Sequence, residues 1–272
     1  MIEYSTKSAD GTTLFGRHWP VEDAKAVMTL VHGFGEHCGR YAPMAAYLNG
    51  QSIAVVTLDF RGHGKSEGRR GVIKSYDDFR ADLAALLSKT RALYPITPHV
   101  LYGHSMGGGI VLDHGSQNLD DLPIIASAPF IKLTDPISKA LRTFVIFMGK
   151  LMPKGGMSQP IDGTKISNLE KEQTLYMDDP LNHGKLSFRL AEAMVTAGER
   201  LSNEAKNWDR PLLLLHSKAD QLTSFQASED FARGAKQTEF HPFETHQHEM
   251  HNDICRAEVY SLMSDFILKH AL

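Results

Sequence analysis

The sequence predicts an α/β fold with a mostly parallel central sheet flanked by helices. Short apolar runs alternate along the chain with longer segments of helical periodicity. Runs that are apolar at nearly every position are typical of strands buried on both faces, as in a parallel sheet covered by helices. At 272 residues the chain is long enough to bury a large core, and we expect residues 1–272 to form a single domain.

The expected strands follow in chain order. Residues 2–19 contain Asp10-Gly11, a pair that suits the positive φ angles of a tight turn, and we expect them to form a hairpin. Buried strands are expected at the apolar runs 26–33, 53–60, 99–105, 122–130, 211–220 and 238–244.

Helices are expected between these runs and after the last one. The helix that follows residue 74 is expected to have Ser75 as its N-cap, together with Asp78. One apolar face of this helix is formed by Tyr76, Phe79, Leu83, Leu86, Leu87 and Leu93. The apolar face of the last helix is formed by Val259, Leu262, Met263, Phe266 and Ile267.

Residues from about 131 to 185 interrupt this alternation, since they are too long for a simple crossover and contain no strand pattern. We expect them to form an inserted helical cap on a core of residues 1–130 and 186–272. An apolar stripe at helical spacing consists of Ile137, Leu141, Phe144, Met148 and Leu151, and Val145, Ile146 and Phe147 extend it. This surplus either packs under the loop PKGGMSQP or lines an apolar channel for a ligand.

Composition excludes several classes of protein. A formal net charge of −3 without charge runs gives no reason to expect a nucleic-acid partner. No apolar run is long enough for a signal peptide or a membrane span. Cys38 and Cys255 cannot form a disulfide framework and suit a reducing compartment, so we expect a cytoplasmic protein.

The residues Gly103-His104-Ser105-Met106-Gly107 match the nucleophile elbow G-x-S-x-G. They lie between an apolar strand and a helix start, which is the context that this motif requires. Serine needs a base and a group that orients the base. Asp220 follows a later strand and is the candidate acid, since the preceding strand end offers no carboxylate.

The base is expected in the histidine-rich loop after the last strand, which contains His241, His246, His248 and His251. No two of these histidines have the i, i+4 spacing of a zincin helix, so we interpret the loop as catalytic and not as a metal site. The amides of Phe34 and Met106 are the expected oxyanion donors. Gly64-Lys65-Ser66 imitates a phosphate-binding loop, but position 59 is aspartate where that motif needs glycine.

The chain contains the motifs HGFGEHCGRY, LDFRGHGKSEG, YGHSMGGG, the SAP of ASAPF, DPL at 179–181, the strand-end Asp220 and HEMHND. Together these motifs resemble the monoacylglycerol lipase and lysophospholipase-like branch of the α/β-hydrolases. The resemblance implies Ser105 as nucleophile, Asp220 as acid and His248 as base, with His246 as the rival base.

The activity that this resemblance implies is hydrolysis of monoacylglycerols to fatty acid and glycerol through an acyl-enzyme on Ser105. The alternatives are a lysophospholipase, a short-chain carboxylesterase, or a hydrolase-like protein that binds without turnover. No metal and no organic cofactor is expected. The expected partners are a lipid ester and, through the cap, a membrane or micelle surface; the sequence carries no signal for an oligomeric state.

Overall fold

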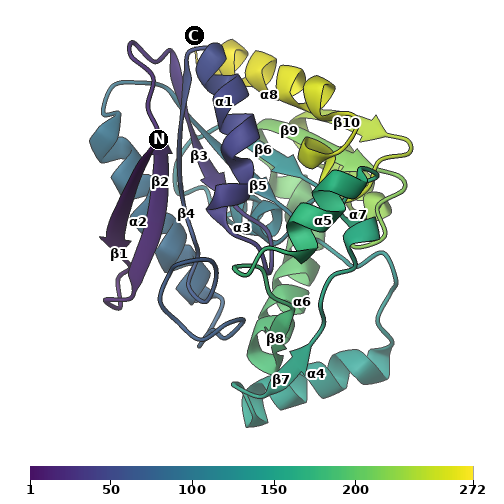
Figure 1. The fold of residues 1–272 in the computed structure, drawn as a ribbon. Coiled ribbons are helices and arrows are strands. Elements are labelled where there is room, and N and C mark those ends of the chain that lie inside the picture. The colour runs from purple at the N-terminus through teal and green to yellow at the C-terminus, as the bar shows by residue number, and fades with distance from the viewer. Residues whose placement is uncertain (272) are drawn as a thin grey trace.

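The computed structural model describes residues 1–271, and its centre is an eight-stranded sheet (Figure 1). The strand order is β1-β2-β4-β3-β5-β6-β9-β10. From β4 to β10 neighbouring strands are parallel, whereas the hairpin β1/β2 joins β4 in antiparallel sense. The predicted fold class is confirmed. The strands are β1 Ile2–Lys7, β2 Thr13–Trp19, β3 Ala26–Val31, β4 Ile53–Leu58, β5 His99–His104, β6 Ile124–Ser127, β9 Asp209–Ser217 and β10 Lys236–Phe243.

Every predicted apolar run forms a strand, and most strands end before the run does. β3 ends at Val31 and β5 at His104, so Gly33 and Ser105 already lie in the turns that follow. β3 and β4 are buried along their whole length, as their composition predicts. The prediction of a buried strand at 238–244 is wrong, because β10 is an edge strand in which only Phe243 is fully buried.

Helices cover both faces of the sheet. α1 (Ala42–Gly50) and α8 (Arg256–His270) pack on one face, where Leu48 and Met263 belong to the same apolar core. The opposite face is covered by four helices that share the second core, as Figure 1 shows. They are α2 Asp77–Leu93, α3 Met106–Ser116, α6 Phe188–Glu204 and α7 Phe225–Gly234.

Two local predictions differ from the structure. α2 has Tyr76 at its N-cap position and no side-chain cap, so Ser75 does not cap it. Asp78 instead accepts a hydrogen bond from the Lys74 amide over 2.6 Å, and the two aspartates of the first turn favour the helix N-terminus electrostatically. In the turn of the β1/β2 hairpin only Gly11, and not Asp10, has a positive φ, of 85°.

The segment between β6 and β9 lies outside the central sheet. It forms α4 (Lys139–Leu151), the strands β7 (Gly156–Ser158) and β8 (Lys185–Ser187), α5 (Glu170–Met177) and then α6. β7 and β8 pair as an antiparallel ribbon, which contradicts the expectation of no strand here. The ribbon was not predictable, because each strand has three residues and β7 is exposed throughout, so neither carries an apolar pattern.

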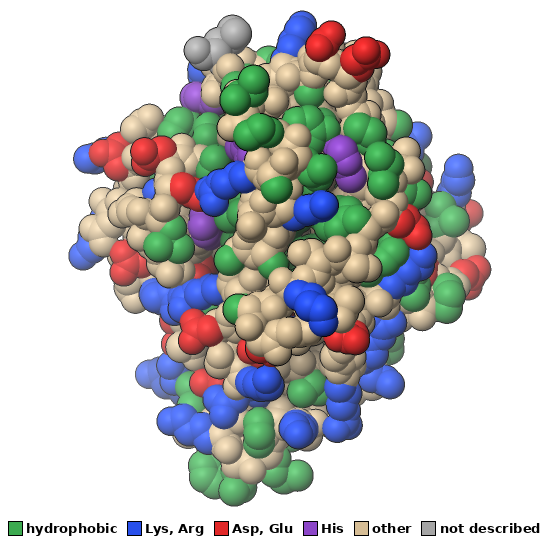
Figure 2. All heavy atoms as spheres, turned by 90° about the vertical axis from the view of Figure 1, so that its left-hand side faces the viewer, with side chains coloured by type: hydrophobic (Ala, Val, Ile, Leu, Met, Phe, Trp, Pro, Cys, Tyr) green, Lys and Arg blue, Asp and Glu red, His purple; other side chains and the backbone are tan. Residues whose placement is uncertain are grey.

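α4 lies at the bottom of the molecule in Figure 1 and packs against α6. Figure 2 shows one face of the protein, on which Lys and Arg side chains gather over the lower half and hydrophobic side chains over the lowest point. Within residues 1–271 no helix is both long and apolar enough to cross a membrane.

Candidate active site

Ser105 lies on a strained turn between β5 and α3. Its φ of 54° and ψ of −118° are unusual for a residue with a side chain, and backbone strain of this kind gathers at functional sites. The neighbouring glycines are required by crowding, as the motif predicts. A Cβ at Gly103 would collide with the Gly107 carbonyl, and one at Gly107 would collide with the Val31 carbonyl. The turn therefore presents the Ser105 side chain at the carboxyl end of the sheet.

Asp220 and His248 are brought together by segments that are far apart in the chain. The Nδ1 atom of His248 lies 2.7 Å from Asp220 Oδ2, and both side chains are buried. Asp220 Oδ1 accepts hydrogen bonds from the amides of Leu222 (2.7 Å) and Thr223 (3.1 Å). Asp220 Oδ2 also accepts from Thr223 Oγ1 over 2.9 Å. The carboxylate is thus held in one orientation.

This pair shifts the proton affinities of both residues. Burial by itself would raise the pKa of Asp220, but His248 and His216 beside it hold that pKa well below its ordinary value. Burial by itself would lower the pKa of His248, whereas the charge and hydrogen bond of Asp220 raise it above the ordinary value. Asp220 is therefore an anion that stabilises the imidazolium form of His248.

The other histidines of the loop have different surroundings. His241 lies in β10, and His246 is half-buried against the ring of Phe243 at 5.8 Å. His251 is fully buried and stacks on Tyr41 with ring centroids 4.9 Å apart. Of these histidines, only His248 is bonded to Asp220 within the part of the chain that the structure describes.

A buried polar cluster lies behind the pair. Arg40 forms ion pairs with both Glu36 and Glu249, and Glu36 accepts hydrogen bonds from the Gly33 amide and the Tyr41 hydroxyl. Glu36 and Glu249 also bring carboxylate oxygens to within 4.8 Å of a His104 ring nitrogen, a spacing that could hold a metal ion. The guanidinium of Arg40 already supplies positive charge to both carboxylates. The cluster therefore has a structural account that needs no ion.

The loop after β3 runs beside Ser105. A Cβ placed on Gly33 would lie 3.2 Å from the Cβ of Ser105, so the Gly33–Phe34 backbone passes directly next to the serine. The amides of Phe34 and Met106 donate to no protein acceptor within residues 1–271. Both predicted oxyanion donors are thus adjacent to Ser105 in the chain or in space and have their N–H groups unused.

Ser105 and His248 line one cavity of about 350 Å³, which we call the acyl cavity. No hydrogen bond joins Ser105 Oγ to His248 within the described residues; such bonds often form only in the substrate complex. Most of the remaining lining is apolar and comes from five segments of the chain. It includes Phe34, Phe130, Leu133, Ile137, Leu141, Phe144, Val145, Met157, Ile161, Leu186, Phe188, Ala191, Met194, Val195 and Leu222.

The apolar stripe of α4 is therefore divided between two environments. Leu141, Phe144 and Val145 line the acyl cavity. Of the surplus residues Val145, Ile146 and Phe147, only Val145 lines it, so the channel hypothesis holds for that residue alone. Phe147 and Leu151 do not line it and are 59% and 62% exposed. Met157 of β7, within the segment 153–160, lines the same cavity.

The sequence profile of a family described as serine aminopeptidase, S33, matches residues 22–254. The chain belongs to this α/β-hydrolase family. A monoacylglycerol lipase of Mycolicibacterium smegmatis is 31% identical over 223 residues, which are 81% of this hydrolase and 79% of that protein. A crystal structure of a Paleococcus ferrophilus monoacylglycerol lipase has a TM-score of 0.86 at 26% identity and covers 94% of this chain and 99% of that chain.

An uncharacterized abhydrolase domain-containing protein of Dictyostelium discoideum is 33% identical over 266 residues, which are 96% of this hydrolase. The match spans only 28% of the length of that protein. The resemblance to the monoacylglycerol lipase type of α/β-hydrolase is confirmed by these relatives together with the family profile.

Sequence patterns did not reveal every residue that supports the site of this hydrolase. His216 is fully buried, with Nε2 3.1 Å from Asp220 Oδ2 and Nδ1 2.7 Å from Ser228 Oγ. Thr223 was missed too; it lies three residues after Asp220, whose side chain accepts hydrogen bonds from its amide and its hydroxyl. Glu36 lies only four residues before Arg40, but the contact of Arg40 with Glu249 joins residues 209 positions apart and has no local signal.

Proposed function

We propose that this hydrolase cleaves monoacylglycerols to a free fatty acid and glycerol through an acyl-enzyme on Ser105. The observation that carries the proposal is the shared lining of one apolar cavity by Ser105 and by His248, whose other ring nitrogen is bonded to the buried Asp220. An apolar cavity with a few polar groups at one end suits an ester with an acyl chain. The monoacylglycerol lipase of Mycolicibacterium smegmatis supports the same substrate class.

In the acylation step Ser105 Oγ attacks the ester carbonyl carbon while His248 Nε2 accepts the hydroxyl proton. The carbonyl oxygen becomes an oxyanion, which the amides of Phe34 and Met106 stabilise, each by about 3–4 kcal/mol in the transition state. The C–O bond to glycerol then breaks, and His248 returns the proton to the leaving glycerol oxygen. Asp220 holds the imidazole in the required tautomer and stabilises its charged form.

Deacylation repeats these steps with water. His248 takes a proton from the water, the hydroxide adds to the acyl carbonyl, and the bond to Ser105 Oγ breaks. The proton passes to Ser105, and the fatty acid leaves. The covalent intermediate divides one difficult hydrolysis into two easier steps.

Residues 131–185 act as the cap in this proposal. Their α4 contributes Leu141, Phe144 and Val145 to the acyl cavity, which suits a chain of medium or greater length. The exposed Phe147 and Leu151 of the same helix meet the lipid aggregate from which the substrate comes.

A substrate profile tests the proposal. kcat/KM is measured for monoacyl, diacyl and triacyl glycerols, for lysophosphatidylcholine and for an acetyl ester. Monoacylglycerols with medium to long chains should have the highest kcat/KM, because each buried CH₂ contributes up to ~0.8 kcal/mol until the cavity is full. A higher kcat/KM for lysophosphatidylcholine or for the acetyl ester would contradict the proposal.

A further inference from the structure

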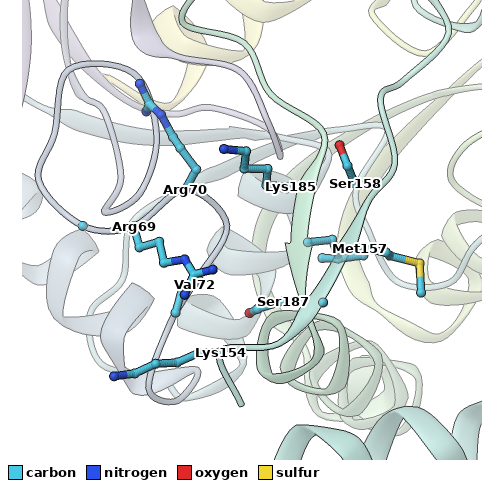
Figure 3. Close-up of a pocket in the computed structure, with 11 residues that line it drawn as sticks. Arg69, Arg70, Val72, Lys154, Met157, Ser158, Lys185 and Ser187 are labelled. Carbon is cyan, nitrogen blue, oxygen red and sulfur yellow. The ribbon is translucent and has the colours of Figure 1, made fainter. Parts of the chain in front are cut away.

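A second cavity of about 490 Å³ lies outside the acyl cavity, between the loop 68–72 and the β7/β8 ribbon (Figure 3). We call it the basic groove. Its lining contains Arg69, Arg70, Lys154 and Lys185 and no acidic residue. Figure 3 shows Arg69 and Lys185 extending into the space between loop and ribbon and Lys154 along its lower end, whereas Arg70 points away and donates to the Gly64 carbonyl.

The cationic groups that face the groove are not neutralised. Within residues 1–271 no carboxylate lies within 4.0 Å of the side-chain nitrogens of Arg69, Lys154 or Lys185. Most other arginines of this hydrolase are ion-paired, including Arg61, Arg80 and Arg142. Like charges around one cavity repel each other, and an anion bound between them removes that repulsion.

Both walls of the groove are held in place. The Ser187 amide donates to the Gly71 carbonyl over 3.0 Å, which ties the ribbon to the loop. Gly71 has a φ of 65°, and a Cβ at this position would collide with the Lys185 carbonyl. Only glycine permits this approach, so the spacing of loop and ribbon is built into the chain.

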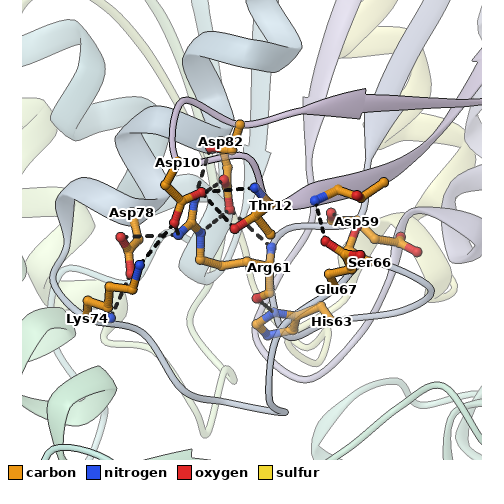
Figure 4. A network of polar contacts seen from close by, with 12 residues as sticks. Asp10, Thr12, Asp59, Arg61, His63, Ser66, Glu67, Lys74, Asp78 and Asp82 are labelled. Atoms are coloured by element: carbon orange, nitrogen blue, oxygen red, sulfur yellow. Dashed lines mark hydrogen bonds and ion pairs between the residues drawn. The ribbon is translucent and has the colours of Figure 1, made fainter.

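The loop is anchored on its other side by a buried arginine (Figure 4). Arg61 forms ion pairs with Asp82 of α2 (2.6 Å), with Asp78 (3.1 Å) and with Asp10 of the hairpin turn (3.0 Å). Asp59 Oδ2 accepts from the Lys65 amide over 2.7 Å. The segment that carries Arg69 is therefore attached to the core at its start, and the groove is a preformed site.

The position of the groove excludes one candidate anion, the head group of the substrate. Met157, Leu186 and Ser187 line both the groove and the acyl cavity, so the ribbon stands between the two. A lipid whose chain fills the acyl cavity would have to cross this ribbon to place its own head group in the groove. The anion is therefore not the head group of the substrate itself.

Exposed apolar side chains directly precede the groove in the chain. Leu151 and Met152 at the end of α4 are 62% and 52% exposed, and Lys154 follows two residues later. Apolar side chains next to basic ones are typical of a surface that binds anionic lipids. We propose that the basic groove binds the phosphate of an anionic phospholipid at a lipid surface. The proposal rests on the proposed function in one respect: binding at a lipid surface holds the acyl cavity where substrate is supplied.

Vesicle binding tests this proposal without any turnover. The protein carries Ser105→Ala so that no lipid is consumed, and its partition coefficient is measured by sedimentation at low salt. Vesicles of phosphatidylcholine alone are compared with vesicles that also contain phosphatidylglycerol. The mixed vesicles should bind the protein more strongly, and added salt should weaken this binding.

The matched variants are Lys154→Gln/Lys185→Gln in the groove and Lys25→Gln/Lys206→Gln near the other ends of the strands. All four lysines are exposed and lack ion pairs within the described residues, and both variants change the net charge equally. The groove variant should bind mixed vesicles roughly tenfold or more weakly, and the control variant less than about twofold more weakly.

Equal losses of vesicle binding in both variants would mean that binding depends on the net charge alone. Equal binding of the protein to both kinds of vesicle would mean that no anion is recognised. Either result overturns the proposal. Binding of soluble glycerol 3-phosphate by the groove, without a preference for mixed vesicles, would assign it to a small phosphate compound and would also overturn it. If wild type lacked ester turnover, the proposed function would fail while this binding experiment kept its meaning.

Discussion

At the scale of single residues, His248 and His246 provide a comparison within one loop. His248 is buried and bonded to Asp220, whereas His246 is half-buried and 3.9 Å from Asp253. We expect His248→Ala to lower kcat by at least about a thousandfold, because the members of a triad act as a unit. His246→Ala should remain close to wild type. A large loss of kcat in His246→Ala with little change in His248→Ala would identify His246 as the base.

The pH dependence of kcat/KM follows from the pair of His248 and Asp220. The base must be neutral to accept a proton, and Asp220 raises the pKa of His248 above the ordinary value of about 6.5. Activity should therefore fall as the pH is lowered through a value above about 6.5. Asp220 remains ionised across this range because its own pKa is well below the ordinary value.

Asp220→Asn is the control for this pH profile. Removal of the negative charge lowers the pKa of His248, so the acid limb of the residual activity should move to lower pH, together with a large loss of kcat. An acid limb that stays in place in Asp220→Asn would show that another group causes it. His104 is a poor candidate, since burial and the nearby His248 hold its pKa well below the ordinary value.

Sequence patterns identify some of these residues and not others. Ser105 was named from the sequence because the elbow needs glycines at fixed positions. Asp220 was named because it follows a late strand and the preceding strand end offers no carboxylate. The choice of His248 over His246 depended on the family resemblance, since both lie in the same loop. His216 and the Arg40 cluster could not be predicted, because their contacts depend on how distant strands and loops pack together.

At the scale of elements, α4 has two kinds of apolar residue. Phe144 is 48% exposed but lines the acyl cavity and lies edge-on to Phe188 at 6.0 Å, whereas Phe147 is 59% exposed and does not line the cavity. Phe144→Asp should lower kcat/KM for a monomeric medium-chain ester at least about tenfold, because a charge would be placed against the chain. An acetyl ester should be affected much less.

Phe147→Asp is the matched variant in the same helix. With the monomeric ester it should behave like wild type, and with aggregated long-chain substrate its rate should fall, because only then is the exposed face of α4 used. Equal effects of both variants on all three substrates would make α4 a purely structural element.

The strands of the central sheet were predictable from the sequence, whereas the β7/β8 ribbon and the N-cap of α2 were not. Burial on both faces makes β3 and β4 apolar at nearly every residue, and that pattern is visible in the chain. The β7/β8 ribbon is short and its outer strand is exposed, so its sequence carries no such pattern. The Ser75 prediction was wrong because α2 begins at Asp77, which places Tyr76 and not Ser75 at the N-cap position.

At the scale of the whole molecule, the topology explains why three distant segments meet. β5, β6 and β9 are parallel neighbours, so Ser105 and Asp220 both leave the sheet at its carboxyl edge. His248 follows β10, which extends the same edge. Ligand sites in open α/β sheets lie outside the carboxyl ends of strands. The mostly parallel sheet was predictable from its apolar strands, whereas the order of the strands and the shape of the acyl cavity depend on how distant segments pack together.

The most direct test of the account is active-site labelling of Ser105, measured together with ester turnover. A fluorophosphonate should modify wild type at Ser105, and turnover should fall in proportion to the modified fraction. Ser105→Ala should take up no label and lose nearly all kcat while its thermal unfolding stays unchanged. A folded Ser105→Ala protein that keeps more than a few per cent of kcat, or a label found on another residue, would contradict the account.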